Sequence, residues 1–462
     1  MSFELYEYKI EDLGKVITGK TPPSKISDAF SAQGIPFVTP KDMDGRRLID
    51  KTERYLSSQG VEAVRNCLLP QNSIAVSCIG SDMGKTVLLP GESITNQQIN
   101  AIVVDSERFD YKYVYYYLST LQDDFKAIAG GSATPILNKG HFSQFKVSLP
   151  VKLLQNKIAL ILDSLDTKIE VNTEISHTLE QMAQALFKSW FVDFEPVKAK
   201  IAALEAGGSQ EESTLAAMTA ISGKEADALV VFEREHPEQY AELKATAELF
   251  PSVMQDSEMG AIPEGWALGT LSDIAIFANG KVDVSSLTPA TYVSTENMLE
   301  NRAGISSASS LPSVNSVPNF RRGHVLISNI RPYFKKIWLA RFEGGRSADV
   351  LAFEARDSVT VEYIYNLLYQ ESFFDFMMLT SKGVKMPRGD KKAIMGWQCI
   401  CPEKKISHAF SKAVGNYYSF IESNHAQNKT LTQLRDTLLP KLLSGEITLP
   451  EAEQAVSEAE NV

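Results

Sequence analysis

The clearest pattern in the sequence is a long stretch in which apolar residues recur every three or four positions. Residues 153–190 contain neither proline nor glycine. This periodicity is typical of an amphipathic helix that packs against a second helix. Position a of the heptad is occupied by Ile158, Leu165, Leu179 and Leu186, with Asn172 at the a position between the two pairs.

The same phase returns near the C-terminus. Three a positions of the first helix recur 252 residues later, and the phase is kept because 252 is a multiple of seven; the recurring residues are Asn424, Leu431 and Leu438. A polar residue at position a costs stability but fixes the register of paired helices. We therefore expect the two helices to pair with each other, as a rod on the order of 50 Å for about 35 residues. The alternative is that each helix packs on its own domain with the asparagine facing water.

The repeat extends over almost the whole chain. Phe37–Thr39 matches Tyr292–Ser294, and Ile74–Ser77 matches Val325–Ser328. Further matches join Gly131, Pro135 and Pro150 to Gly383, Pro387 and Pro402. The offset stays between 250 and 255 residues, so the chain contains two copies of one unit. Two copies suit a target that is itself divided into two parts.

Outside the long helices, each copy has the pattern of a compact α+β domain. Short β-branched or aromatic runs at 73–77 and 324–328 are bounded by turn residues, and helical stretches occur around 111–121 and 361–370. We expect an α+β fold class, with a first domain at 1–150, a first long helix at 151–195, an acidic helical connector at 196–262, a second domain at 263–402, a second long helix at 403–445 and a disordered acidic tail at 446–462. Within the connector, helical patterns at 198–205, 224–235 and 238–249 accompany a loop at 207–209.

Composition fits a globular protein of two or three domains, because the 462 residues are 44% apolar and 22% charged. No apolar run reaches the length that spans a bilayer, and the first residues lack the layout of a secretory signal. We therefore expect a cytoplasmic protein with no membrane contact. Cys399 and Cys401 align with the apolar residues Val147 and Leu149, which favours buried thiols over metal or redox chemistry.

The net charge of −11 is concentrated outside the repeated domains. Residues 195–262 carry 13 acidic and 5 basic side chains, and residues 442–462 carry 5 acidic and none that is basic. In contrast, residues 301–346 hold eight arginines and lysines against the single acid Glu343. A local basic field can attract a polyanion even on an acidic protein.

One segment matches the phosphate-loop pattern GxxxxGK[ST], namely Gly14–Thr21. We interpret the match as accidental, because the preceding residues are polar and Pro22-Pro23 follows where a helix should begin. The sequence also lacks an adenine-methylating tetrad, a dinucleotide fingerprint, a nucleophile elbow and histidines at metal-ligand spacing. Together these absences favour a binding protein over an enzyme.

Basic and amide residues in turn-rich segments are the remaining candidates for chemistry. Arginine and lysine neutralise phosphates or read guanine, while asparagine and glutamine read adenine. Any single basic residue is more often part of a solvated surface, but the dense run in 321–336 would repel itself without a partner. The candidate DNA-binding residues are Lys20, Lys41, Arg46, Lys85 and Lys139 in the first domain and Arg321, Arg322, Arg331, Lys335, Lys336, Lys385, Arg388 and Lys391 in the second, with Lys25, Arg47, Lys392 and Tyr333 nearby.

The chain strongly resembles the specificity (S) subunit of type I restriction–modification systems. The resemblance rests on four pieces: Leu149–Ile169, Met182–Pro196, the motif Gly260-Ala261-Ile262-Pro263-Glu264-Gly265-Trp266, and Leu431–Ile447. Together with the repeat they cover essentially the whole chain.

The resemblance implies that each α+β domain is a target-recognition domain reading one half of a bipartite double-stranded DNA sequence. The long helices would pair antiparallel and dock two methyltransferase (modification) subunits, which motor-nuclease (restriction) subunits would join. S-adenosylmethionine, ATP and Mg²⁺ would belong to those partners, and this chain would hold no cofactor or metal and perform no catalysis. The alternatives are a nucleotide-using enzyme built on Gly14–Thr21 and a protein-binding scaffold without DNA specificity.

Overall fold

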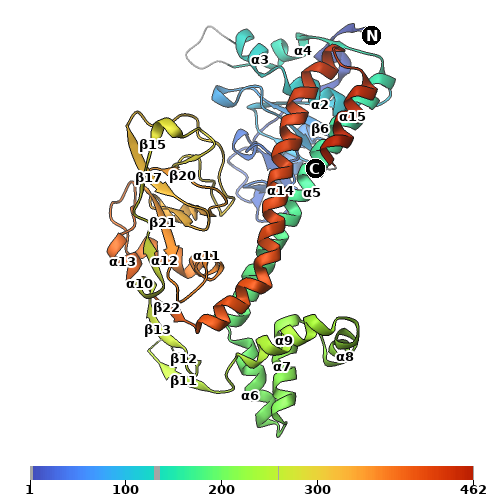
Figure 1. The fold of residues 1–462 in the computed structure, drawn as a ribbon. Coiled ribbons are helices and arrows are strands. Elements are labelled where there is room, and N and C mark those ends of the chain that lie inside the picture. Colours follow the sequence, from blue (N-terminus) through green and yellow to red (C-terminus); the bar gives the residue numbers. More distant parts are fainter. Residues whose placement is uncertain (1–3, 130–135, 259, 461–462) are drawn as a thin grey trace. The chain divides into compact units, whose positions relative to one another are not determined.

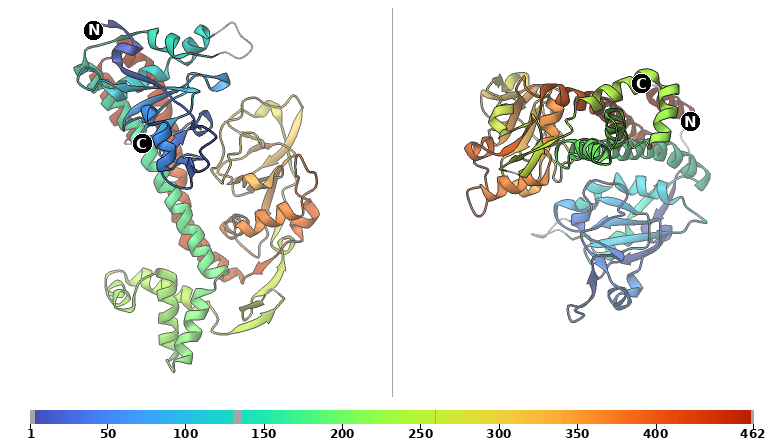
Figure 2. Two further views of the ribbon diagram at one scale, coloured as in Figure 1. Left: turned by 180° about the vertical axis from the view of Figure 1, so that it is seen from behind. Right: turned by 90° about the horizontal axis from the view of Figure 1, so that it is seen from below.

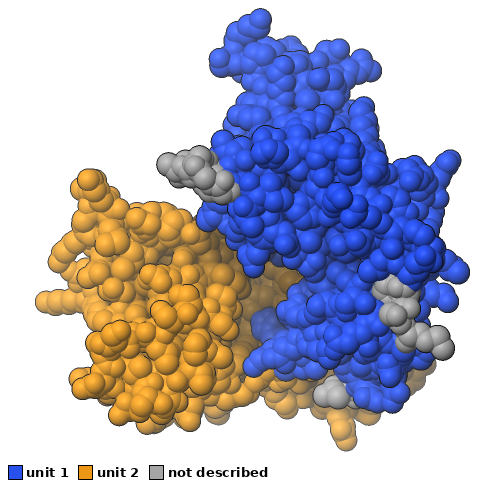
Figure 3. All heavy atoms as spheres, turned by 90° about the horizontal axis from the view of Figure 1, so that it is seen from above, with its two compact units in different colours: residues 1–172, 425–462 blue, residues 173–424 orange. Residues whose placement is uncertain are grey.

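The chain divides into two compact units in the computed structural model, which describes residues 4–129, 136–258 and 260–460. Unit 1 comprises residues 1–172 and 425–462, and unit 2 comprises residues 173–424 (Figure 3). Each unit therefore takes part of its chain from both copies of the repeat. Gly131 and Pro135, which belong to the repeat pattern, lie outside the described residues.

Unit 1 contains two small sheets stacked over a shared core. The first sheet is antiparallel, in the order β2-β9-β6-β7 (Gly14–Thr18, Ile99–Val104, Ser73–Ser77, Thr86–Leu89). The second has the order β3-β5-β4-β8 (Phe30–Ser31, Tyr55–Leu56, Ile35–Val38, Ile94–Thr95), with β4 and β8 parallel. A separate pair joins β1 to β10 (Tyr6–Lys9, Lys146–Leu149).

The first sheet is buried on both faces, as the apolar run in β6 dictates. Successive side chains of a strand point to opposite faces. Ala75 packs between the two sheets, whereas Ile74 and Val76 pack toward the helices. The helices of this domain are α1 to α4 (Ser58–Ala63, Tyr111–Ser119, Gln122–Ile128, Lys139–Gln144), with the 3-10 turns η1 to η4 (Ile10–Leu13, Pro40–Asp42, Arg65–Cys67, Gly80–Asp82).

Unit 2 repeats the topology of the first sheet, which confirms the duplication and the mixed helix-and-strand class, but the strands of its second sheet join in a different order. Its first sheet has the order β14-β21-β18-β19 (Ala275–Phe277, Val350–Ala355, Val325–Ser328, Ile337–Leu339). Its second has the order β15-β17-β20-β16 (Lys281–Asp283, Ser316–Phe320, Gly344–Arg346, Tyr292–Val293), again with one parallel pair, β16 and β20. The pair β13 and β22 (Ala267–Thr270, Gln398–Cys401) corresponds to β1 and β10. Helices α10 to α13 (Leu271–Ile274, Val361–Leu368, Glu371–Leu379, Lys391–Met395) and the turns η5 and η6 (Val284–Ser286, Pro332–Phe334) complete the domain.

Two long helices are present, as the heptad pattern predicts: α5 (Lys152–Phe191) and α14 (Lys404–Ser444). The boundary between the units falls inside both helices. In unit 1, Ile158 and Leu165 of α5 share one core with Leu431 and Leu438 of α14, and the two helices lie side by side (Figures 1 and 2). In unit 2, Leu179 and Leu186 pack against the core that contains Phe410 and Val414 of α14.

Polar contacts show that the two helices run antiparallel in each unit. In unit 1, Asp166 pairs with Arg435 at 2.7 Å, while Asn172 Nδ2 donates to Gln427 Oε1 at 2.8 Å and to Asn428 Oδ1 at 2.9 Å. Residue numbers thus rise along one helix as they fall along the other. In unit 2, Asn424 Nδ2 donates to Ser176 Oγ at 3.1 Å. The pairs 172 with 428 and 424 with 176 are equivalent under the 252-residue offset, so both a-position asparagines make the same contact.

The heptad phase is not kept along the whole of α5. Ile175 and Met182, which fall at position d of the same heptads and should therefore face the partner helix, are 37% and 46% exposed, whereas Ser176, Ala183 and Phe187 are buried. An α-helix has 3.6 residues per turn, so its contact face drifts by about 20° per heptad unless the helices supercoil fully. The drift brings the C-terminal half of α5 onto the helices of the second α+β domain.

The connector is helical, with one helix more than the sequence indicated and a strand pair. Its elements are α6 to α9 (Glu195–Glu205, Gln210–Ser222, Ala226–Glu235, Pro237–Glu248) and the antiparallel strands β11 and β12 (Met254–Ser257, Gly260–Pro263). Helix α7 starts at a capping box formed by Ser209 and Glu212. Its buried residues include Ser213, Thr214 and Ala217, which give no strong apolar periodicity.

The C-terminal tail is a correction to the sequence-based expectation of disorder. Residues Leu449–Glu460 form helix α15, and at its start the N–H and the hydroxyl of Thr448 both donate hydrogen bonds to the Glu451 carboxylate. Ala452 and Val456, one turn apart, are buried in the core of unit 1. The acidic face of α15 remains in solvent while its two small apolar residues provide the contact. Among the described residues, no helix is both long and apolar enough to cross a membrane.

Glu180, on α5 in unit 2, is a carboxylic acid with one oxygen out of reach of solvent. Burial raises the pKa of Glu180 to about 7, against the opposing influence of Arg341 and of hydrogen bonds from Gln184 and Tyr365. Within the described chain, nothing donates a hydrogen bond to its solvent-inaccessible Oε1. The folded protein therefore binds this proton more tightly than the unfolded chain does.

Between about pH 4.5 and about pH 7 the folded chain holds the Glu180 proton, which the unfolded chain has already lost. Folding therefore takes up a proton in this range, and stability should fall as pH rises through it. E180Q should lack this contribution and be more stable than wild type at pH 8 by on the order of 2 kcal/mol. Urea unfolding at pH 5 and pH 8 measures both values. E174Q, on the exposed side of the same helix, is the matched control, and equal pH dependence in wild type and E180Q would contradict the prediction.

Candidate nucleic-acid interface

In unit 1, Arg47 ties the basic segment that follows β4 to the long helices. Its Nε donates to Glu170 Oε1 at 2.9 Å and its guanidinium pairs with Asp163 Oδ1 at 2.6 Å. Burial opposes the charge, but Glu170 and Asp163 together raise the pKa of Arg47 above its ordinary value. Arg47 is thus a structural residue, although the sequence placed it among the basic candidates.

The same network continues to the second long helix. Tyr116 accepts a hydrogen bond from Arg47 at 3.2 Å and donates one to Asp166 at 2.6 Å, and Asp166 also pairs with Arg435 of α14. Burial, reinforced by Asp166, raises the pKa of Tyr116, so its hydroxyl stays a donor. The position of the segment 40–51 is therefore fixed relative to α5 and α14.

The candidate basic residues of unit 1 differ in whether their charge is matched. Arg46 pairs with Asp44 at 3.0 Å and Asp50 at 3.1 Å, and Lys85 pairs with Asp82 at 2.7 Å. The hydrogen bond to Asp44 raises the pKa of Arg46. Both basic side chains line one cavity of about 480 Å³, which also includes Tyr116 and Arg435.

The remaining candidates of unit 1, Lys20, Lys41 and Lys139, are exposed. Burial raises the pKa of the Cys67 thiol, while the charges of Lys20 and Lys139 act in the opposite direction. Two lysines that lie far apart in the sequence thus act on the same thiol.

In unit 2, several members of the basic run are held by acids that the sequence did not place near them. Arg322 makes two 2.7 Å hydrogen bonds to Glu422 of α14. Lys335 pairs with Glu371 at 2.6 Å, and Arg388 pairs with Asp349 at 3.1 Å. Lys336 donates to the carbonyl of Thr295 at 2.9 Å. The self-repulsion expected of this run is relieved by these partners.

Arg321, Arg331, Lys385 and Lys391 of unit 2 are exposed, and no described carboxylate forms an ion pair with them. Two of them lie on loops that are hydrogen-bonded together. The Arg331 N–H donates to Pro387 O at 2.8 Å, and the Gly389 N–H donates to Asn329 O at 3.1 Å. Loops 329–336 and 381–390, which we call the paired loops, therefore form one structural feature.

Unit 1 has the equivalent loop contact. The Leu137 N–H donates to Cys78 O at 3.0 Å, and Ile79 bridges to Ile136. These contacts correspond to those at 329–330 and 388–389 at offsets of 251 or 252. Each α+β domain thus joins the loop after β6 or β18 to the segment before α4 or α13.

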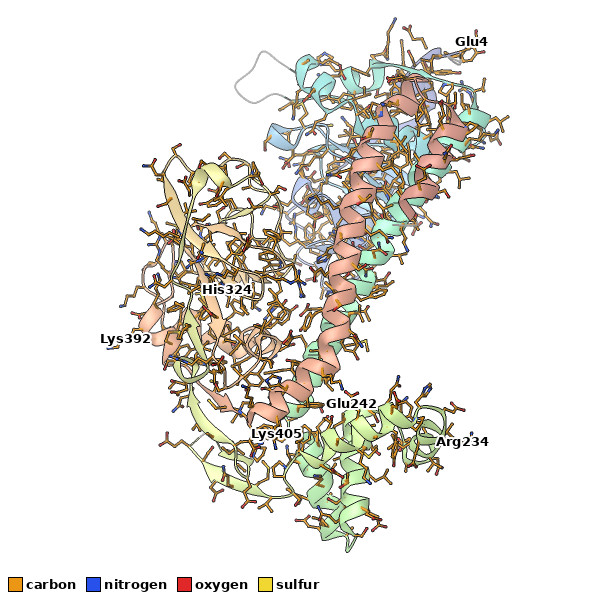
Figure 4. All side chains as sticks on the ribbon, viewed as in Figure 1. Glu4, Arg234, Glu242, His324, Lys392 and Lys405 are labelled. Atoms are coloured by element: carbon orange, nitrogen blue, oxygen red, sulfur yellow. The ribbon has the colours of Figure 1, made fainter. Side chains whose placement is uncertain are left out.

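Two basic residues were missed among the candidates, Lys281 and Arg346. With Lys391 they line a cavity of about 430 Å³ in unit 2. Arg346 is buried, its three hydrogen-bond acceptors are the backbone carbonyls of Asn319, Val350 and Ala278, and burial lowers its pKa. The sequence could have identified Lys281 as a candidate, since Gly280-Lys281 repeats Gly19-Lys20. The repeat gives no indication of Arg346, because its counterpart in the first copy is Thr95. Lys392, next to Lys391, extends outward from α13 (Figure 4).

The phosphate-loop match has no loop conformation. Gly14–Thr18 form β2 and pair with β9 from Gly14 opposite Val104 to Thr18 opposite Asn100. Backbone N–H groups engaged in a sheet cannot cradle a phosphate. Across the described residues, no group of three His, Cys, Asp or Glu side chains is placed to hold a metal ion.

Comparison with known proteins finds similarity to proteins of one kind. Residues 4–181 match the family described as "Type I restriction modification DNA specificity domain". The chain is 33% identical, over 349 residues, to the type I restriction enzyme HindI specificity subunit of Haemophilus influenzae, which covers 70% of this chain and 74% of that protein. It is 24% identical to the type I restriction enzyme MjaIX specificity subunit of Methanocaldococcus jannaschii, over 96% of this chain and 93% of that protein.

Among solved structures, the S subunit of a type I restriction–modification system from M. genitalium resembles this chain with a TM-score of 0.50. The sequence identity is 15%, and the match covers 96% of each chain. At that identity the likeness concerns the fold.

R47A should destabilise unit 1 by about 2–4 kcal/mol, because it removes a largely buried cation that pairs with both Asp163 and Glu170 and leaves Asp163 with Lys112 alone. Chemical denaturation of the full chain measures the loss. R65A is the matched control in the same unit: Arg65 and Glu62 form a pair that is about three-quarters exposed on each side, and such pairs contribute little. Equal losses in the two variants would contradict the anchoring role of Arg47.

Proposed function

The chain belongs to the family of type I restriction enzyme specificity subunits, and on this basis we propose that it gives such an enzyme its DNA sequence specificity. Each unit contains one target-recognition domain, and each domain reads one half of a bipartite duplex target. The observation that carries the proposal is the duplication: a two-sheet domain with the same first sheet and the same joined loops occurs once in each unit.

The proposed interface consists of the exposed basic residues that keep an unmatched charge, of which Arg331 and Lys385 lie on the paired loops. In the first domain they are Lys20, Lys41 and Lys139, and in the second they are Arg321, Arg331, Lys385 and Lys391. Arginine and lysine contribute most of the affinity of protein for duplex DNA by neutralising phosphates. The residues already held by acids, such as Arg322 and Lys335, contribute less because DNA would have to displace Glu422 and Glu371.

We further propose that the partners are two methyltransferase subunits, with motor-nuclease subunits joining that core. The methyltransferase would flip and modify its adenine, while this chain recognises the target sequence and has no catalytic role of its own. S-adenosylmethionine, ATP and Mg²⁺ belong to those partners in this proposal. The strand conformation of Gly14–Thr18 argues against the nucleotide-using alternative, whereas a scaffold without DNA specificity is an outcome that experiments must separate.

The decisive experiment is to determine the methylated motif in a host that carries this chain together with its methyltransferase partner. We expect a two-part motif with an unspecified gap, absent when the chain is deleted. Methylation that is unchanged by the deletion, or a continuous motif, would contradict the proposal.

Salt dependence tests the interface itself. K385A with K391A should weaken duplex binding and reduce the slope of log K against log [salt] by about 2, since each phosphate contact contributes about 0.9. K198A with K244A removes the same charge from exposed sites on the acidic connector, and this control should leave the slope unchanged. A flat salt response in wild type would favour the scaffold alternative.

A further inference from the structure

The loop that follows β6 in unit 1 and β18 in unit 2 has the same length and the same closing hydrogen bond in both domains but different residues. In unit 1 the loop runs from Ser77 to Lys85, closed by a hydrogen bond from Ser77 N–H to Lys85 O at 2.9 Å. In unit 2 it runs from Ser328 to Lys336, closed by the equivalent bond at 3.1 Å. The two loops have the same length, so their positions correspond one to one at an offset of 251.

Two positions of this loop are left-handed in both domains. In unit 1 they are Gly80 and Gly84, with φ of 67° and 83°. In unit 2 the corresponding residues are Arg331 and Lys335, with φ of 50° and 51°. Glycine adopts this conformation without a steric cost, whereas other L-residues pay for it. Arg331 pays further because it precedes Pro332, and proline biases the residue before it toward extended conformations.

The surroundings of Arg331 hold its backbone in place. Its N–H donates to Pro387 O at 2.8 Å, and its carbonyl accepts from Phe334 N–H at 3.0 Å. Lys335 N–H donates to Pro332 O at 2.8 Å, and Pro332 is buried. The loop is therefore a rigid turn that aims the Arg331 side chain from a fixed point.

The two strained residues differ in what their side chains do within the chain. Lys335 has an internal reason to be retained, because its ammonium pairs with Glu371 at 2.6 Å. Arg331 is exposed, and none of the ion pairs formed by the described residues includes it. A strained residue whose side chain stabilises nothing locally points to a role outside the chain.

We propose that Arg331 is a sequence-determining residue of the second domain and reads a guanine in the major groove of its half-site. This proposal rests on the proposed function. A phosphate contact is made equally well by a flexible side chain on unstrained backbone, whereas paired hydrogen bonds to guanine O6 and N7 require a fixed guanidinium. A backbone held rigid at a conformational cost fits the second requirement.

R331G is the sharpest test, because glycine is the residue that unit 1 uses at this position. The full-length variant should melt at the wild-type temperature or above it, because the strain is relieved. In the assembled complex its affinity for the target should nevertheless fall about tenfold or more, the discrimination that a bidentate arginine–guanine contact provides. In host DNA, one guanine of a single half-site should become unspecified in the methylated motif, while the other half-site is unchanged.

K335G is the matched control, since it relieves the same strain four residues away and removes the same charge. Its methylated motif should remain that of wild type. R331N, whose side chain tolerates the left-handed region, should reproduce R331G and separates the loss of the guanidinium from any effect of glycine itself. R331K keeps the charge but not the planar fork, and should relax the motif as R331G does.

The outcomes distinguish failure of this inference from failure of the proposed function. A wild-type chain that directs no two-part motif overturns both. A two-part wild-type motif that R331G leaves intact overturns only the role of Arg331. Uniformly weaker methylation of an unchanged motif, with R331K restored to wild-type affinity and R331G reducing the salt slope by about 1, would mean that Arg331 contacts a phosphate and would also overturn it. A melting temperature of both R331G and R331N well below wild type would show that Arg331 is needed for the fold.

Discussion

The constraint on which this structure depends is that neither recognition domain is completed by its own half of the sequence. The core of unit 1 contains Leu431 and Leu438 from the end of the chain beside Ile158 and Leu165. The core of unit 2 joins Phe187 and Trp190, from the helix that follows the first domain, to Phe410 of the second. Burial of this apolar surface is the main stabilising contribution, so the antiparallel pairing of α5 with α14 is a condition for both units.

The polar residues in that pairing select one arrangement among several. Leucines at positions 172 and 424 would make the helix pairing more stable than the two asparagines do. Each asparagine, however, finds its hydrogen-bond partner, Asn428 or Ser176, in only one register. The network of Asp166 with Tyr116, Arg47 and Arg435 then connects the helices to the first domain. Register within the pair and the placement of the loops on it are therefore set by buried polar contacts rather than by apolar area alone.

Sequence reasoning was reliable where one signal repeats over many residues. The duplication and the long helices were predictable because the 252-residue offset keeps the heptad phase at several positions. It failed where the signal is short: α7 buries serine, threonine and alanine, and the fully buried residues of α15 are only Ala452 and Val456. The exposed Ile175 and Met182 show that a strict heptad overstates how far a nearly straight helix keeps one face inward.

The candidate interface was predictable as a region but not residue by residue. Charge density identified the run 321–336, yet Glu422 lies 100 residues from Arg322 and Glu371 lies 36 residues from Lys335, so only the fold reveals which charges are already matched. Backbone strain at Arg331 leaves no trace in its own sequence neighbourhood. The repeat does indicate the left-handed backbone at this position, because the equivalent residue in the first copy is Gly80.

The interleaved cores also have a temporal consequence. During synthesis the apolar side of the first long helix emerges well before its partner, since the 252 residues of unit 2 must be translated between Asn172 and His425. At elongation rates of about 5–20 residues per second, that interval is roughly 12–50 s. Throughout it the nascent first domain presents Ile158, Leu162 and Leu165 uncovered, a surface that chaperones or neighbouring ribosomes encounter before the C-terminal helix arrives to bury it.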